Sequence, residues 1–296
     1  MGWRLGRADT DLGPVRHTAV TVRIGISGWT YPPWRGKFYP PALPHREELR
    51  YVAERMNSVE INGSFYSLQR RSSFETWAAS VPEDFVFAVK GGRFITHMKK
   101  LSGIETPLAN FLASGVLALD QKLGPILWQL PPNLGFDADR MDAFFAQLPR
   151  TAGAAAKIAA NHDQRVSDDH ALIKAGHPRQ RLRHAVEVRH KSFRTREFYQ
   201  LLRRHKIALV VADNPGQWPI ITEITTDFMY VRLHGHEQLY ASGYSDRELD
   251  EWAAKINSWT ERGCDVYVYC DNDAKVRAPY DAMGLMERLG IRAPAA

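Results

Sequence analysis

Residues 184–190 read HAVEVRH, a short apolar run with charges inside it. Ala185, Val186 and Val188 are typical of a buried strand. Glu187 and Arg189 lie two residues apart, so in a strand both side chains point to the same face. A charge buried alone costs several kcal/mol, and these charges therefore need partners from other parts of the chain. The stretch predicts a place where several strands bring polar side chains together.

Seven more β-rich runs resemble this one in length: VRIGIS (22–27), SVEIN (58–62), FVFAVK (85–90), PILWQL (125–130), ALVVAD (208–213), FMYVRLH (228–234) and DVYVYC (265–270). Helical patterns lie between most of them, at 45–56, 137–148, 195–205 and 246–263. This alternation favours parallel pairing, and eight strands predict an α/β fold, a TIM-like (β/α)8 barrel. An open doubly wound sheet is the alternative, but no Gly-rich phosphate loop follows the first strand.

The expected domain is a single barrel over residues 22–292, preceded by a flexible lead-in at 1–21. Strands six and seven are separated by NPGQWPIITEITTD, which is too short for a full helix and predicts one irregular βα unit. The polar, His- and Arg-rich segment 157–183 predicts an insertion before the fifth strand.

The composition of the chain excludes several classes of protein. The chain has 296 residues, 44% of them hydrophobic, with two cysteines and no apolar run of signal-peptide or membrane-span length. These features predict a cytoplasmic protein without a disulfide framework and without a membrane partner. The net charge of +6 is compatible with nucleic acid, although Arg-rich helices that only solvate the surface explain it as well. The sequence carries no signal for an oligomeric state.

Polar residues end strand after strand: Glu60, Asn62, Lys90, Gln129, Glu187, Arg189, Asp213, Arg232, His234, Asp271, Asn272 and Asp273. In a parallel barrel the carboxyl ends of the strands meet at one mouth, so these groups should meet there and pair. For any single residue, an ion pair that only holds strands in register, such as Glu187–Arg189 or Glu60–Arg232, is an equal alternative. For the whole set, the clustering predicts a binding site at the mouth.

Two kinds of loop flank the predicted mouth. Trp29, Tyr31 and Trp34 lie in SGWTYPPWRGKFYP (27–40), and Tyr240 and Tyr244 lie in EQLYASGYSD. These aromatic side chains could stack on a base or a sugar, or could simply pack the loops down. The loop KGGRFITHMKK (90–100) is basic, which suits a phosphate or a carboxylate.

Several longer pieces, among them IGISGWTYPPWRGKFYP, FVFAVKGGRFITH, RHAVEVRHKSF and VYCDNDAKVRAP, together resemble domain-of-unknown-function family 72, the YecE-like proteins. The resemblance runs from about residue 22 to about residue 290. It implies a TIM-like barrel with a polar cavity at the strand carboxyl ends, and it implies no activity. Matching motif positions are Gly28, Trp29, Tyr31, Trp34, Glu60, Tyr66, Lys90, Gln129, Glu187, Arg189, His190, Arg232, His234, Gly235, Asn272 and Asp273. Cys270 stands where the pattern has an aromatic residue, usually Phe.

The leading hypothesis is an enzyme of hydrolase or lyase type that acts on a small anionic ligand or phosphate ester. Glu60 or Glu187 would be the general base, and His234 the acid or proton shuttle. The expected substrate-binding residues are Trp29, Tyr31, Trp34, Tyr66, Lys90, Gln129, Arg189, Arg232, Tyr240, Tyr244, Asn272 and Asp273. No cofactor is expected.

Three alternatives stay open. A metal-dependent hydrolase or nuclease would use Glu60, Glu187, Asp213 and His234 as ligands of a divalent ion, but cations near the same mouth make a metal the less favoured reading. A glycosidase would use the two glutamates as acid and base, and their positions on strands two and five disfavour a short separation between them. A non-catalytic binder of nucleic acid or of a metabolite needs only the aromatic and basic loops.

Overall fold

A computed structural model describes residues 20–293 and arranges eight parallel strands in a closed barrel. The strands are β1 Val22–Ser27, β2 Ser58–Ile61, β3 Val86–Lys90, β4 Leu123–Gln129, β5 His184–Glu187, β6 Ala208–Asp213, β7 Phe228–Leu233 and β8 Asp265–Cys270. Each strand pairs with the next, and β8 closes the sheet by pairing with β1 over Val22–Ile26. The predicted TIM-like barrel is confirmed.

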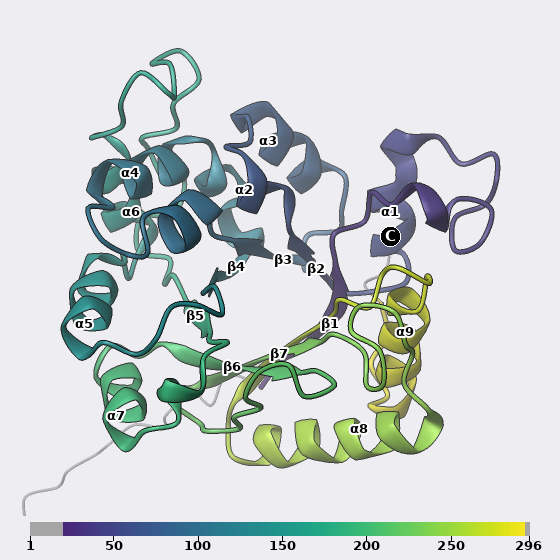
Figure 1. Ribbon diagram of the computed structural model, residues 1–296. Helices are drawn as coiled ribbons and strands as arrows, with labels where there is room; N and C mark the ends of the chain where they lie inside the picture. The colour runs from purple at the N-terminus through teal and green to yellow at the C-terminus, as the bar shows by residue number, and fades with distance from the viewer. Residues whose placement is uncertain (1–19, 294–296) are drawn as a thin grey trace, which may run out of the picture.

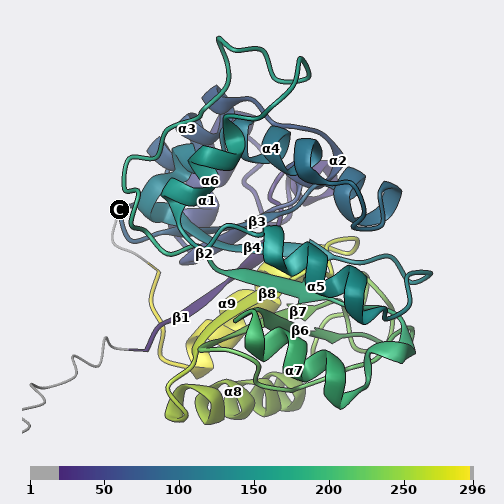
Figure 2. The same ribbon diagram turned by 90° about the vertical axis from the view of Figure 1, so that its left-hand side faces the viewer.

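The helices form a ring outside the strands, as Figure 1 shows along the barrel and Figure 2 from the side. They are α1 Glu48–Ala53, α2 Gly63–Tyr66, α3 Arg71–Ala79, α4 Glu105–Ala113, α5 Ala138–Gln147, α6 Ala152–Ala159, α7 Arg196–Arg204, α8 Asp246–Glu261 and α9 Ala278–Arg288. Local signals set their ends: α8 begins with a capping box in which Ser245 and Glu248 each bond the other's backbone N–H. Within residues 20–293, no helix has the length and apolar character of a membrane span.

Two segments interrupt the regular alternation of strands and helices. In the described part of the chain no helix lies between β6 and β7, so the irregular βα unit is confirmed. The predicted insertion at 157–183 begins within α6 and continues as a loop that extends outward beyond α4 and α6 (Figures 1 and 2). The proposed lead-in at 1–21 lies almost wholly outside the described residues.

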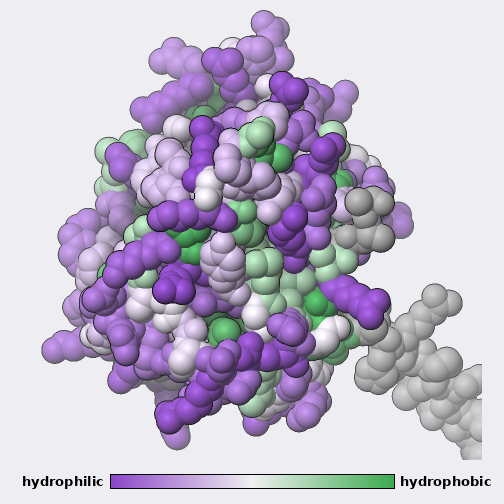
Figure 3. All heavy atoms as spheres, turned by 90° about the vertical axis from the view of Figure 1, so that its right-hand side faces the viewer, coloured by the Kyte–Doolittle hydropathy of each residue, from purple (hydrophilic) through white to green (hydrophobic). Residues whose placement is uncertain are grey.

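The strands are buried on both faces. Their outer face packs on the helices, while a separate interior core is made of Ala88, Leu127, Ala185, Ala208, Val210, Ala212, Phe228, Tyr230, Tyr267 and Tyr269. Interior residues recur at every second position because side chains alternate along a strand. This alternation decides which strand-end side chains reach the mouth. The outer surface over α1 and α9 is mainly hydrophilic, with scattered apolar areas (Figure 3).

Candidate active site

The polar residues of the mouth continue the interior positions of the strands. Lys90 lies two residues after Ala88, and Arg232 lies two residues after Tyr230. The same two-residue step places Ser27, Glu60, Gln129, Glu187 and Asp271 on the inner face at the ends of their strands. The sequence therefore directs polar side chains from six different strands, and one that follows β8 directly, toward one point.

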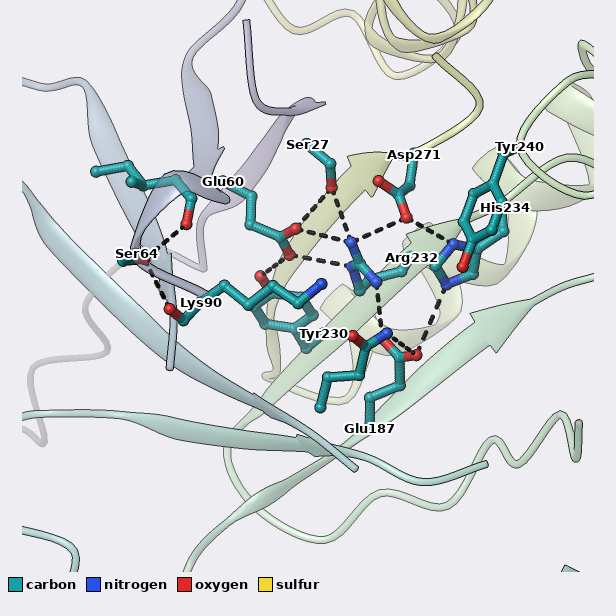
Figure 4. Close-up of polar contacts among 12 residues, drawn as sticks. Ser27, Glu60, Ser64, Lys90, Glu187, Tyr230, Arg232, His234, Tyr240 and Asp271 are labelled. Carbon is teal, nitrogen blue, oxygen red and sulfur yellow. Dashed lines mark hydrogen bonds and ion pairs between the residues drawn. The ribbon is translucent and has the colours of Figure 1, made fainter. Parts of the chain in front are cut away.

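Arg232 is the centre of this group and has no exposed surface (Figure 4). Its Nε and Nη2 donate to the two carboxylate oxygens of Glu60, at 3.1 and 2.9 Å. Its Nη1 donates to Oε2 of Glu187 at 2.9 Å, and its Nη2 also lies 3.0 Å from Oδ2 of Asp271. One guanidinium therefore holds three carboxylates, from β2, from β5 and from the residue that follows β8, and its fixed fork of donors suits this role.

Both oxygens of each glutamate carboxylate accept hydrogen bonds. The hydroxyls of Ser27 and Tyr230 each donate to Glu60 at 2.6 Å. Gln129 and Arg189 donate to Oε1 of Glu187 at 2.9 and 2.8 Å. Burial alone would raise the pKa of Glu187, but the charges of Arg189 and Arg232 hold it well below its usual range. A carboxylate held ionised in this way is a weak base.

Asp271 joins the same network from the end of β8. Its Oδ2 lies 2.8 Å from Nδ1 of His234, which is itself fully buried. Burial would raise the pKa of Asp271, but the charge of Arg232 and the neighbouring His234 lower it to about 2. The rings of Trp218 and Tyr240 pack edge-on against His234, with centroids 5.6 and 5.4 Å away. His234 is thus enclosed by the protein beneath the mouth.

Lys90 differs from every other charge in this group. The residue is only 7% exposed, yet its Nζ makes no hydrogen bond or ion pair with the described residues. The Nζ lies 4.2 Å from the centroid of the Phe65 ring, and in Figure 4 only the carbonyl oxygen of Lys90 is bonded, to Ser64. Burial, and next the charge of Arg232, lower the pKa of Lys90 to about 8. The amine is therefore partly uncharged near neutral pH.

A cavity of about 740 Å³ opens above this network. Its wall is made of Tyr31, Asn62, Phe65, Tyr66, Lys90, Arg93, His97, Met98, Gln129, Arg189, Tyr240, Asp271 and Asp273. Arg189 is held in place by Glu187 and by Trp218, whose ring lies 4.1 Å from its guanidinium carbon. Arg93 is exposed and has no ion-pair partner in residues 20–293. The open cations of the wall suit an anionic ligand.

Two further titratable side chains of the wall have shifted pKa values. Partial burial, with the charges of Lys90 and Arg189, lowers the pKa of His97 to about 4, so the ring is neutral at neutral pH. His97 lies on a turn of π-helix, Phe94–Met98, directly after β3, and such turns are frequent at functional sites. Burial and the charge of Asp271 raise the pKa of Asp273. Asp273 therefore holds a proton at higher pH than an ordinary aspartate.

The structure separates the residues expected at the site into three groups. Tyr31, Tyr66, Lys90, Gln129, Arg189, Tyr240 and Asp273 line the cavity. Glu60, Glu187, Arg232 and His234 lie beneath it, fully buried in ion pairs and close polar contacts. Trp29, Trp34, Tyr244 and Asn272 lie away from it.

The residues of the third group have structural contacts instead. Trp29 packs edge-on against Trp77, and Trp34 is fully buried with its Nε1 donating to the carbonyl of Asp273 at 3.0 Å. Tyr244 donates to Asp213 at 2.8 Å. Asn272 donates to the side chain of Asp281 at 2.6 Å, on the outer side of the barrel wall. These four side chains hold loops and helices in place.

Several wall residues were absent from the set expected to bind substrate: Asn62, Phe65, Arg93, His97, Met98 and Asp271. Asn62 and Asp271 have the inner-face spacing, two residues after Glu60 and Tyr269, and that spacing identifies them. Arg93 and His97 belong to the basic loop that follows β3. Phe65 and Met98 are apolar loop residues, and no pattern in the sequence distinguishes them from core residues.

Of the four residues considered as metal ligands, Glu60, Glu187 and His234 lie around the guanidinium of Arg232, a cation, and Asp213 lies elsewhere. Glu60 and Glu187 bind Arg232, and Asp213 faces outward to Tyr244. In the described ranges, no group of three or more His, Cys, Asp or Glu side chains has the arrangement needed to hold a metal ion.

The amino-acid sequence is similar to those of known proteins. The sequence model of the family described as "Protein of unknown function DUF72" matches residues 23–296. The UPF0759 protein YunF of Bacillus subtilis is 22% identical over 305 residues, which cover 91% of this chain and 95% of YunF.

Two solved structures have the same fold. A DUF72 family protein from Thermotoga maritima superposes with a TM-score of 0.72 at 25% identity, over 91% of this chain and 99% of the other. A DUF72 family protein from Enterococcus faecalis superposes with a TM-score of 0.70 at 16% identity, over 93% and 99%.

Proposed function

We propose that this chain, which belongs to the DUF72 family of proteins of unknown function, is an enzyme whose active site is the mouth of its barrel. Its substrate is a small molecule that carries a carboxylate or a phosphate. Lys90 performs the chemistry, and Arg93 and Arg189 bind the anionic group. The ion-pair network around Arg232 lies beneath these groups and supports them.

The observation that carries this proposal is the unpaired amine of Lys90. A buried charge without a partner is costly, and structural ion networks satisfy each of their charges. Here Arg232, Glu60 and Glu187 are all paired, whereas the Nζ of Lys90 has a cation–π contact with Phe65 at 4.2 Å but no hydrogen bond or ion pair within residues 20–293. A pKa of about 8 also suits proton transfer near neutral pH. An unpaired, partly neutral amine is expected of a reacting group.

Of the two reaction types considered, a lyase fits this site better than a hydrolase. Hydrolysis with a glutamate as the base that activates water is disfavoured, because the buried carboxylates are bound to Arg232 and Arg189. A lysine with a lowered pKa can take a proton from carbon or bind a carbonyl carbon. The proposal also places the enzyme in the cytoplasm, because two buried cysteines that are not joined suit a reducing compartment.

Anion binding tests the proposal most directly. Inorganic phosphate is expected to raise the melting temperature of the protein, and Arg93→Met is expected to weaken the phosphate Kd about tenfold, the effect of one charge-assisted contact. Arg93 is exposed and unpaired among the described residues, so this variant should fold. Arg247→Met, on the outer surface of α8, is the matched control. Phosphate binding that is absent from the wild type, or equal in both variants, would contradict the anion site.

A further inference from the structure

The amine of Lys90 is placed to form a bond as well as to move a proton. It stands on the inner face of the barrel wall, with the Phe65 ring 4.2 Å from its Nζ and no acceptor that bonds it in residues 20–293. We infer that Lys90 is a nucleophile that forms an imine with the carbonyl carbon of a substrate bearing a carboxylate or a phosphate. This inference rests on the proposed function and adds the class of substrate to it.

The surroundings keep the nitrogen lone pair available. Lysine nucleophiles are activated by removal from water and by a neighbouring cation, and both conditions hold here. The residue is 7% exposed, and the charge of Arg232 acts on it. With a pKa of about 8, about a quarter of the amine is neutral at pH 7.5, compared with about one part in a thousand for an ordinary lysine.

The cavity offers partners for the rest of such a substrate. Arg93 and Arg189 lie on the same wall as Lys90 and suit the carboxylate or phosphate. Oδ1 of Asn62 is buried without a hydrogen-bond partner among the described residues, and Asn62 lines this cavity. A buried acceptor without a donor is expected to gain one from a ligand, such as a hydroxyl next to the carbonyl.

The step balances without an oxidant or a reductant. The lone pair of Nζ attacks the carbonyl carbon, the π electrons of the C=O bond move to oxygen, and a proton passes from nitrogen to that oxygen. The hydroxyl then takes a second proton and leaves as water while the C=N bond forms. Asp273 lines the same cavity as Lys90 and has a raised pKa, so it can supply that proton. The imine withdraws electrons from the adjacent carbon, which is what a lyase requires.

Reductive trapping tests the inference. The full-length protein is incubated with sodium cyanoborohydride and one of three carbonyl compounds: glyoxylate, dihydroxyacetone phosphate or propanal. Hydride adds to an imine carbon and leaves a stable secondary amine, which peptide mapping by mass spectrometry locates. Labelling of Lys90 by at least one of the two anionic compounds is expected, at least tenfold faster than labelling by propanal. If glyoxylate labels Lys90 faster, the site prefers a carboxylate. If dihydroxyacetone phosphate labels it faster, the site prefers a phosphate.

Variants supply the controls. The adduct is expected to disappear in Lys90→Met and in Lys90→Arg, which keeps the positive charge but cannot form an imine. It is expected to persist in Lys157→Met, which removes an exposed lysine of α6. The peptide map of the wild type decides the question by itself even if a Lys90 variant does not fold.

Different results would contradict the imine at Lys90 and the anion-binding site. If phosphate binds but neither anionic compound labels Lys90, or if exposed lysines are labelled as fast, the imine is wrong and the anion site stands. If Lys90 is labelled no faster by the anionic compounds than by propanal, and phosphate does not bind, the amine is reactive but the proposed anionic substrate is wrong.

Discussion

Arg232 donates to both carboxylate oxygens of Glu60, at 3.1 and 2.9 Å, in an ion pair of which neither side chain is exposed. The pair joins β7 to β2 across the inside of the barrel, and Glu187 extends it to β5. A buried charge network of this kind is costly to break at one member, because the partner is left uncompensated.

Glu60→Gln is therefore expected to lower the free energy of unfolding by about 3–5 kcal/mol, the usual cost of breaking a buried pair. Denaturant unfolding measures this loss. Glu75→Gln is the matched control, since Glu75 forms an exposed pair with Arg71 at 2.7 Å and should cost less than about 1 kcal/mol. Equal losses in the two variants would mean that the buried network contributes no more than a surface pair.

The lowered pKa of Lys90 predicts a pH dependence of stability. Below about pH 8 the amine is charged in both the folded and the unfolded protein, so the cost of burying that charge is felt in full. Above pH 8 the folded protein loses this proton first, and the cost is relieved up to the ordinary value of 10.5. The free energy of unfolding of wild type minus that of Lys90→Met should rise by about 2 kcal/mol between pH 7 and 9.5. A difference that does not change with pH would show that the pKa of Lys90 is not lowered.

Gly91, the residue after Lys90, packs closely against the ring of Trp128. A Cβ added at Gly91 would lie 2.4 Å from the Cε3 and Cζ3 atoms of Trp128, which is fully buried and cannot move aside freely. Gly91→Ala is expected to cost about 1–3 kcal/mol of stability, as over-packing does. At Gly92 the nearest atom to an added Cβ is the carbonyl oxygen of Ser64 at 3.7 Å, so Gly92→Ala should cost less. Thermal melts of the two variants compare them, and a larger loss at Gly92 would contradict this packing.

Tyr244 and Tyr240 occupy similar places in the sequence and different places in the structure. Tyr244→Phe removes the donor to the buried carboxylate of Asp213 and should cost about 1–3 kcal/mol of stability without changing the phosphate Kd. Tyr240→Phe removes a hydroxyl that lines the cavity and accepts from Arg189 at 3.3 Å, so it should change the phosphate Kd more than Tyr244→Phe does. Titration calorimetry with both variants tests the assignment, which the reverse order of effects would overturn.

The fold could be predicted from the sequence because each strand is a short apolar run, and helical patterns lie between most of the runs. The direction of a side chain at the end of a strand was harder to predict. Asp271 and Asn272 are neighbours, yet only Asp271 has the inner-face spacing set by Tyr267 and Tyr269, while Asn272 faces Asp281 outside. A strict count by two along each strand separates them, and it also separates the outward Asp213 from Arg232.

The pairs Glu60–Arg232 and Glu187–Arg189, considered from the sequence as braces between strands, are present, but the complete set of contacts in the mouth could not be predicted in the same way. Glu60, Glu187 and Asp271 bind one guanidinium because the closed barrel brings β2, β5 and β8 together, and no local pattern records those distances. Lys90 has no ion pair among the described residues for the same reason, since Glu60, Glu187 and Asp271 are already bound to Arg232. Trp34 is buried because its loop folds back on itself, which the crowding of aromatic residues allowed but did not specify.

The aromatic side chains inside the barrel determine the order in which the products of a cleavage at Lys90 leave. Tyr230 and Tyr269 are fully buried beneath Arg232, with ring centroids 5.2 Å apart, and they fill the barrel below the mouth. Molecules that reach Lys90 therefore arrive and depart on the same side. If a substrate is cleaved there, the fragment attached to Lys90 sits deeper than the other fragment. The outer fragment must leave first, and the attached one last, so the two products are released in a fixed sequence.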